Sequence, residues 1–209
     1  MKRNYQLETD KITSSIGQDQ RPTLLLHSCC GPCSSYVLEY LSQFFDITVL
    51  FFDPNIQPQE EYNKRLVCQK KVLQAMNIEL MDCGYEGERF TAVARPLADE
   101  PEGGERCTRC FILRIEETAK RAKEGDFDFF CTTLSVSPHK DAERINLIGE
   151  KMSGKYAVKW LFSDFKKKGG YARSVELAKQ MDLYRQGYCG CVYSLVQAQR
   201  VNDVKGPDR

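Results

Sequence analysis

The sequence predicts an α/β fold in which helices cover both faces of a parallel sheet. Short apolar runs, typical of buried strands, alternate along the chain with longer segments whose apolar residues recur at helical spacing. The chain has 209 residues, of which 42% are hydrophobic, and this is enough for one compact domain. We expect a polar N-terminal extension over residues 1–22, a single α/β domain over residues 23–200 and a polar tail over residues 201–209.

The first half of the chain contains three predicted strands, over residues 23–26, 46–55 and 78–82. The first strand ends at His27, and the prolines at 54 and 58 prevent the second from continuing. Two helices are predicted between these strands, because apolar residues recur there at helical spacing. These residues are Val37, Leu41 and Phe44 for the first helix, and Tyr62, Leu66, Leu73 and Met76 for the second.

In the second half, prolines and glycines between residues 88 and 105 predict a short helix followed by a mobile loop. A helix opens at Cys107, and strands follow over residues 127–132 and 157–162. Between those strands, Ser137 and Pro138 predict a helix start, with serine as N-cap and proline at the first helical position. The last main helix is predicted over residues 174–185.

The charge of the chain is nearly balanced, with a formal net charge of +1 at pH 7. No strong global field therefore attracts nucleic acid, and any RNA contact must come from a local basic patch. Residues 1–20 are polar and charged and lack the apolar core of a signal peptide, and no run approaches the roughly 18 apolar residues of a membrane span. We expect a cytoplasmic protein that does not enter a membrane.

Ten cysteines are unusual for such a protein, because cytosolic thiols stay reduced and clustered ones are more often metal ligands or redox catalysts. The notable groups are Cys29, Cys30 and Cys33, then Cys107 and Cys110, then Cys189 and Cys191. Residues 29–33 follow a predicted strand, and positions 107 and 110 share one face of a predicted helix. The strand end and the helix can therefore present their thiolates to one site.

Four of these thiolates suit either a structural zinc ion or an iron–sulfur cluster. The four are Cys29, Cys30, Cys107 and Cys110. Zinc sites usually use two Cys-x-x-Cys pairs, whereas adjacent cysteines at 29 and 30 fit a larger cluster better. Burial as plain thiols is the remaining alternative, which the polar neighbours of these cysteines disfavour.

The pair Cys189 and Cys191 can close into a small, strained disulfide, and its reduced form can deliver two electrons. The alternative is that one or both are further metal ligands or packed thiols. The remaining cysteines of interest are predicted to be ordinary core residues: Cys68, Cys83 and Cys131.

Several single residues are weaker candidates. Asp53 ends the second predicted strand, where it can bind metal or substrate or simply cap a turn. His27 is predicted to be a polar core residue, and His139 is either a proton donor, a phosphate contact or part of a helix cap. A basic stretch, which by itself predicts only a solvated surface, comprises Lys151, Lys155, Lys159, Lys166, Lys167, Lys168 and Arg173.

Five motifs resemble those of a known family and follow its order between about residues 24 and 193. They are His27-Ser28-Cys29-Cys30-Gly31-Pro32-Cys33, Phe52-Asp53-Pro54-Asn55-Ile56, Arg106-Cys107-x-x-Cys110, Thr132-Thr133-Leu134-x-x-Ser137-Pro138 and Tyr188-Cys189-Gly190-Cys191. On these motifs the chain resembles the QueH family of epoxyqueuosine reductases. One motif alone is a weak signal, whereas five in order are highly specific.

The resemblance implies a Rossmann-like parallel sheet sandwiched by helices, of the adenine-nucleotide alpha-hydrolase-like (HUP) class. Members of that class that use ATP carry a Ser-Gly-Gly-x-Asp-Ser-like phosphate loop after the first strand. Here the cysteines of residues 29–33 stand in that place. We infer that a metal site replaces the nucleotide-phosphate site.

The resemblance also implies a reaction, the two-electron reduction of the epoxide of epoxyqueuosine in tRNA to queuosine. It takes place at the wobble position of the anticodon and is the last step of queuosine biosynthesis. The family's 4Fe-4S ligands match Cys29, Cys30, Cys107 and Cys110, and its redox-active pair matches Cys189 and Cys191. An external electron donor would supply that pair. Cys33 and Asp53 are candidates for holding a second, mononuclear iron, with Asp53 also a catalytic candidate.

The partner implied is tRNA carrying epoxyqueuosine, held through its phosphates by the basic stretch, with Tyr188 or Phe52 stacking on the modified base. Two other functions stay open on the residues alone. One is a thiol–disulfide oxidoreductase with a structural zinc, and the other is a zinc-stabilised RNA-binding module.

Overall fold

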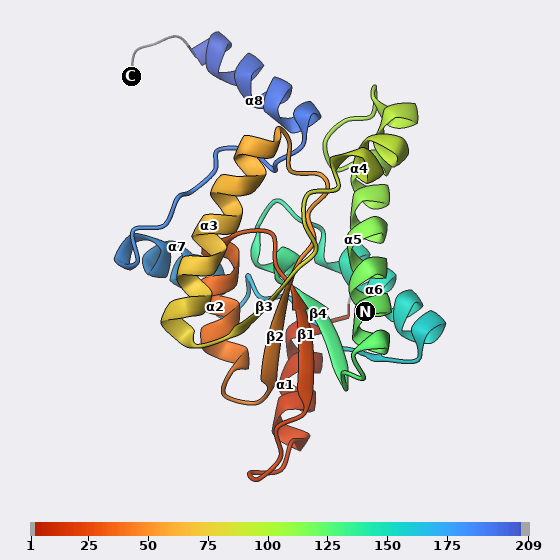
Figure 1. Cartoon of the computed structure of the whole chain (residues 1–209), viewed down its shortest axis with the longest axis vertical. Helices are drawn as coiled ribbons and strands as arrows, with labels where there is room; N and C mark the ends of the chain where they lie inside the picture. The colour runs from red at the N-terminus through yellow and green to blue at the C-terminus, as the bar shows by residue number, and fades with distance from the viewer. Residues whose placement is uncertain (1–2, 206–209) are drawn as a thin grey trace.

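The computed structural model describes residues 3–205, which contain a five-stranded parallel sheet (Figure 1). In space the strands follow the order β3, β2, β1, β4 and β5, and every paired neighbour is parallel. Their bounds are β1 Thr23–His27, β2 Asp46–Phe51, β3 Glu79–Asp82, β4 Phe129–Thr132 and β5 Lys159–Trp160. The predicted α/β class is therefore confirmed, and the carboxyl ends of the strands share one edge.

Helices cover both faces of this sheet, with α2 and α3 on one side and α5 and α6 on the other (Figure 1). The helices are α1 Tyr5–Ser15, α2 Gly31–Leu41, α3 Gln59–Met76, α4 Gly87–Ala94, α5 Glu105–Glu124, α6 Ala142–Tyr156, α7 Gly170–Gln180 and α8 Val192–Lys205, with short 3-10 turns η1 Arg95–Leu97 and η2 Thr133–Val136. Since α7 packs on α2, it belongs to the first of these layers.

The central strand β1 is buried from both sides. Leu24 and Leu26 lie in the core on the α2 side, whereas Leu25 packs with Phe111 and Ile115 of α5. This division follows from strand geometry, because successive side chains point to opposite faces. A continuous apolar run is therefore what a strand covered on both faces requires.

The predicted helix start at Ser137 is wrong. Ser137 instead follows the turn η2, and α6 begins at Ala142. Its N-cap is Asp141, whose side chain accepts a hydrogen bond from the Arg144 amide at 3.2 Å. Serine and aspartate cap helices about equally well, so the local sequence offered two starts. Helix α6 runs from Ala142 and buries Ile145 and Ile148 against the sheet.

Both ends of the described part of the chain form helices, although their composition is polar. Within the predicted N-terminal extension, α1 buries Thr9, whose hydroxyl donates to the Phe162 carbonyl at 2.7 Å. Helix α8 runs to Lys205, into the predicted tail, whereas residues 206–209 lie outside the described residues. The division into extension, domain and tail stays a prediction. Within residues 3–205, none of the helices combines the length and apolar character needed to cross a bilayer.

Candidate functional site

The strand-to-helix turn between β1 and α2 brings three thiols together. Cys30 is the N-cap of α2, Pro32 lies in its first turn, and Cys33 follows within that turn. The sulfur atoms of Cys29, Cys30 and Cys33 all lie within 4.8 Å of one another, and those of Cys29 and Cys30 are 3.9 Å apart. A tetrahedral ion with metal–sulfur bonds of about 2.3 Å separates its sulfurs by about 3.8 Å, so this group fits a thiolate-bound metal.

The neighbouring thiols shift the pKa values of Cys30 and Cys33 in opposite directions. Hydrogen bonds from Cys29 and Cys33 hold the pKa of Cys30 well below its usual range, and Gln186 Nε2 also donates to the Cys30 sulfur at 3.2 Å. The same interactions with Cys29 and Cys30 raise the pKa of Cys33 well above its ordinary value. Three thiolates this close together would repel one another without a cation, so full deprotonation of the group calls for a bound metal.

Gly31 allows the close approach of α2 to α3 at this turn. A β-carbon at position 31 would lie 2.7 Å from the Cys68 sulfur and 2.8 Å from the Cys68 carbonyl oxygen. Both contacts are too short for a β-carbon. The carbonyl oxygen belongs to the backbone of α3, which cannot move aside as a side chain can.

We therefore expect a Gly31→Ala variant to bind less metal and to be destabilised by about 1–3 kcal/mol, because overpacking displaces the start of α2. Urea unfolding and metal analysis of the purified protein measure the two effects. Gly154→Ala is the matched control, since a β-carbon there meets nothing within 4 Å. Wild-type metal content and stability in Gly31→Ala would contradict the expectation.

The cysteines at 107 and 110 lie in the first two turns of α5, as predicted. The Gly103 amide donates to the Cys107 sulfur at 3.2 Å, and burial raises the pKa of Cys110 to about 12. Both lie outside the group of three thiols within 4.8 Å. The four-cysteine ligand set therefore stays a prediction.

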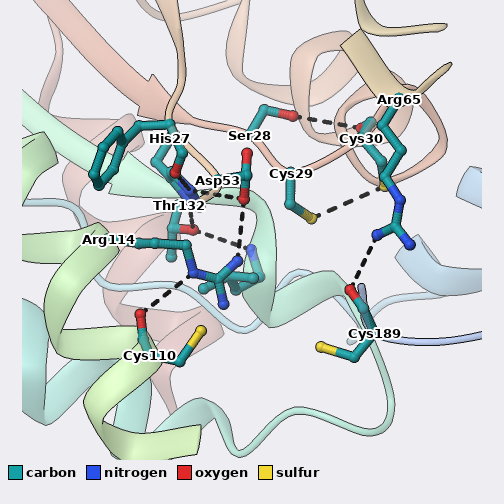
Figure 2. Close-up of polar contacts among 12 residues, drawn as sticks. His27, Ser28, Cys29, Cys30, Asp53, Arg65, Cys110, Arg114, Thr132 and Cys189 are labelled. Atoms are coloured by element: carbon teal, nitrogen blue, oxygen red, sulfur yellow. Dashed lines mark hydrogen bonds and ion pairs between the residues drawn. The ribbon is translucent and has the colours of Figure 1, made fainter. Parts of the chain in front are cut away.

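The predicted candidate Asp53 is fully buried beside Arg114 of α5 and His27 (Figure 2). Arg114 Nη1 donates to Asp53 Oδ1 at 3.2 Å, and His27 Nε2 lies 3.4 Å from the same oxygen. His27 also bonds the Phe52 carbonyl and the Thr132 hydroxyl, which confirms it as a polar core residue. Removing one partner of such a buried ion pair costs about 3–5 kcal/mol.

One oxygen of Asp53 and one guanidinium nitrogen of Arg114 are buried and have no hydrogen-bond partner among the described residues. Free polar atoms of this kind are suited to a metal or a polar ligand. Asp53 is not part of the close group formed by the thiols of Cys29, Cys30 and Cys33. A second iron held by Asp53 and Cys33 therefore stays a prediction. The ion pair favours a role for Asp53 as the counter-ion of Arg114.

The segment with Cys189 and Cys191 crosses the same edge of the sheet, and both are free thiols. Arg65 of α3 donates to the Cys189 carbonyl at 3.0 Å and to the Tyr188 carbonyl at 3.3 Å. Gly190 takes a φ of 129°, which favours glycine. The two thiols differ, because Cys191 is buried whereas Cys189 is half-buried.

A cavity of about 720 Å³ joins these parts. Its lining includes Cys29, Cys33, Arg114, Lys140, Tyr188 and Cys189. Figure 2 shows the sulfurs of Cys110 and Cys189 turned toward the region around the Arg114 guanidinium. Cysteines of the first and third groups, Cys29, Cys33 and Cys189, thus line one cavity at the carboxyl edge of the sheet, where α/β folds bind their ligands, whereas Cys107 and Cys110 are not part of its described lining.

The basic stretch is divided between two edges of the molecule. Lys159 begins β5, so it lies at the amino-terminal edge of the sheet, away from the cavity. Lys151 and Lys155 lie in the last two turns of α6, which leads back to that edge. The lysines that follow β5 lie nearer the cavity, since Lys166 Nζ donates to the carbonyl of the cavity residue Lys140 at 3.4 Å.

These lysines are also partly neutralised. Lys166 pairs with Asp164 at 2.7 Å, and Lys168 pairs with Asp10 at 2.6 Å. Arg173 pairs with Glu39, likewise at 2.6 Å. The sequence showed the basic residues without showing these acidic partners, so the local positive field is weaker than the composition of the stretch suggests.

Four residues of the site were missed by the sequence interpretation: Arg65, Arg114, Lys140 and Gln186. Each contacts a thiol, the cysteine loop or Asp53 from a distant part of the chain. Lys140 lies within the stretch Ser137-Pro138-His139-Lys140-Asp141, in which the sequence suggested a role for His139. His139 itself lines the cavity and is exposed. Cys68 and Cys131 are buried core residues, as predicted, and Cys83 is half-buried.

A family model described as epoxyqueuosine reductase QueH matches residues 24–197. Among curated proteins, the epoxyqueuosine reductase QueH of Staphylococcus epidermidis is 42% identical over 203 residues, which cover 93% of this chain and 85% of that protein. The Streptococcus pyogenes protein of the same name is 40% identical over 205 residues, with 93% and 80% covered.

Among solved structures, the U34-tRNA thiolase NcsA from Methanococcus maripaludis, with its [4Fe-4S] cluster, matches with a TM-score of 0.54. The match covers 95% of this chain and 72% of that chain at 14% sequence identity. At this identity the likeness concerns the fold, and it agrees with the predicted HUP-like class.

Proposed function

The chain belongs to the QueH family of epoxyqueuosine reductases, and we propose that it performs the family's reaction with a thiolate-bound iron–sulfur cluster and the Cys189/Cys191 dithiol. The reaction is the reduction of the epoxide of epoxyqueuosine to queuosine at the wobble position of tRNA, the last step of queuosine biosynthesis. The observation that carries the proposal is a cavity whose lining includes Cys29, Cys33 and Cys189.

The chemistry requires a balanced supply of electrons and protons. Converting an epoxide to an alkene consumes two electrons and two protons and releases water. A dithiol that closes to a disulfide releases two electrons, so one Cys189/Cys191 pair matches one turnover. An external electron donor then restores the dithiol.

We propose that the cluster is held by the family's four ligand positions, Cys29, Cys30, Cys107 and Cys110. The close sulfurs at residues 29 and 30 and the free thiols on α5 are suitable donors. When bound, such a cluster carries single electrons, and an iron with an open position polarises an oxygen as a Lewis acid. Cys33 and Asp53 remain candidates for a second iron.

Two residues that line the cavity are suited to orient the substrate. Arg114 has a buried, unpartnered nitrogen and lines the cavity, so it can donate a hydrogen bond to a substrate oxygen. Tyr188 also lines the cavity and can stack on the modified base. The prediction that Phe52 can stack on the base is wrong, because Phe52 is fully buried beneath Arg89.

The size of the cavity limits what enters it. A volume of about 720 Å³ lies within the roughly 300–1,000 Å³ of small-molecule sites. One modified nucleoside fits such a space, and the rest of the tRNA must stay outside. The wobble nucleotide is therefore unstacked from its neighbours when it binds.

Anaerobic purification tests this assignment. A brown protein that contains iron and sulfide and absorbs broadly near about 400 nm supports the iron–sulfur reductase. A colourless, zinc-loaded protein would instead support a thiol–disulfide oxidoreductase with structural zinc. The same zinc-loaded protein without thiol exchange activity would support an RNA-binding module.

Reversing the charge of Lys166, Lys167 and Lys168 should raise the apparent tRNA dissociation constant and flatten its salt dependence. Each lost phosphate contact reduces the slope by about 0.7–0.9, because fewer counterions are released. Filter binding of anticodon stem-loop RNA across a salt series measures both quantities. The matched control reverses the charges of Lys151 and Lys159, which lie toward the opposite edge of the sheet from the cavity. Unchanged affinity and salt slope in the triple variant would show that the RNA binds to another face of the protein.

A further inference from the structure

The two thiols of the Cys189/Cys191 pair occupy different environments. The Cys191 side chain lies in a buried cluster with Phe90 and Cys110, and its sulfur donates to the Ser194 hydroxyl at 3.5 Å. Cys189 lines the cavity, and Cys191 is absent from the lining formed by the described residues. A reactant in the cavity therefore reaches Cys189 first.

Lys140 contacts the cavity-facing thiol directly. Its ammonium group donates to the Cys189 sulfur at 2.7 Å. Lys140 precedes α6, is half-buried and lies 5.7 Å from the centre of the Phe111 ring. Burial would lower the pKa of Lys140, but the neighbouring Cys189 and the hydrogen bond to it outweigh burial and raise that pKa. The ammonium is thus kept charged at the sulfur.

Other charged groups around Cys189 act through different atoms. Arg65 of α3 binds the Cys189 carbonyl and is paired with Glu61 at 2.7 Å, so it fixes the backbone of the loop. Arg114 of α5 pairs with Asp53 through Nη1, and no hydrogen bond joins it to the Cys189 sulfur among the described residues. Cys110 lies nearby on α5 and is a thiol whose burial opposes ionisation. Among the described residues, Lys140 is the cation hydrogen-bonded to the Cys189 sulfur.

We propose that Lys140 is a positioning residue that holds the Cys189 sulfur as a thiolate facing the cavity, so that Cys189 reacts first and Cys191 closes the disulfide. An ammonium in contact with a sulfur favours the thiolate, which is the reactive form. The proposal rests on the redox role assigned to the pair under the proposed function.

The electron and proton balance of the step is complete. The S–S bond forms between Cys189 and Cys191, which releases two electrons and the one proton of Cys191. The epoxide takes up both electrons and this proton, together with a second proton from solvent. Its two C–O bonds break, and an alkene and water result.

The test is the alkylation of Cys189 by iodoacetamide in the reduced holoenzyme, followed peptide by peptide with mass spectrometry. In Lys140→Gln we expect Cys189 to react about tenfold more slowly at neutral pH, because fewer molecules carry the thiolate. Raising the pH should recover the rate, and Lys140→Arg should retain most of it. Lys151→Gln, on the far part of α6, is the control and should react as the parent does.

The outcomes separate this proposal from the proposed function. An unchanged Cys189 alkylation rate in Lys140→Gln and in Lys140→Met would overturn the role of Lys140, even if the dithiol is essential. Loss of iron in both variants would also overturn it, since Lys140 would then act through the metal site. If Cys189→Ser left turnover unchanged, the dithiol assignment would fail instead.

Discussion

A Cys107→Ser variant is expected to lose its iron and sulfide and to have no measurable turnover. Serine replaces a soft thiolate ligand with a hydroxyl, which iron–sulfur clusters do not favour. Cys107 occupies the first turn of α5, and within the described part of the chain its sulfur is hydrogen-bonded by the Gly103 amide alone, so its replacement should leave the fold intact. Iron and sulfide analysis, visible absorbance and a turnover assay measure the effect. Cys30→Ser should behave in the same way.

Cys83→Ser provides the matched control for the ligand variants. Cys83 is likewise half-buried, but it lies beyond the end of β3 and its pKa is raised to about 11 by burial. This control should keep its iron and its activity. Full iron content and activity in Cys107→Ser would show that the cluster assignment is wrong.

A Cys189→Ser variant is expected to keep the cluster spectrum and to fail in multiple turnover. The backbone of this loop is held by Arg65 and by the Gln57 amide, which donates to the Gly190 carbonyl, and these contacts do not involve the sulfur, so serine preserves the local structure. Without the second thiol, the pair cannot deliver two electrons and be reduced again. Conversion of epoxyqueuosine tRNA under multiple-turnover conditions, measured beside the cluster spectrum, shows the defect.

Cys191→Ser should reproduce this phenotype if the two sulfurs act as one disulfide. Loss of the cluster in Cys189→Ser would make Cys189 a metal ligand. Unchanged multiple turnover in either variant would make the pair a bystander. Ser194→Ala, which removes the partner of the Cys191 sulfur but leaves both thiols, serves as the control for local packing.

Much of the fold could be predicted because the buried strands are visible in the sequence as short apolar runs. The run Leu24, Leu25 and Leu26 is apolar on both faces, and its end at His27 is where β1 ends. The start of α6 could not be predicted, since Ser137 and Asp141 are both good caps and burial of the helix decides between them. The extent of α1 was hidden by its polar sequence.

The site was predictable only in part. Closely spaced cysteines such as Cys29 and Cys30 are visible in the sequence, because their chemistry depends on local spacing. The Lys140–Cys189 and Arg65–Cys189 contacts join residues that are 49 and 124 positions apart. Nothing local distinguishes these two cations from surface charges, so only the folded chain reveals them.

The central claim is that this chain reduces epoxyqueuosine with an iron–sulfur cluster. The most direct measurement is to incubate the anaerobically purified protein with a reductant and tRNA carrying epoxyqueuosine. The tRNA is then digested, and the masses of its nucleosides are measured by mass spectrometry. We expect the iron-containing protein to yield queuosine, lighter by one oxygen atom, and Cys107→Ser to yield none. A colourless, zinc-loaded protein that leaves epoxyqueuosine unchanged would contradict the claim.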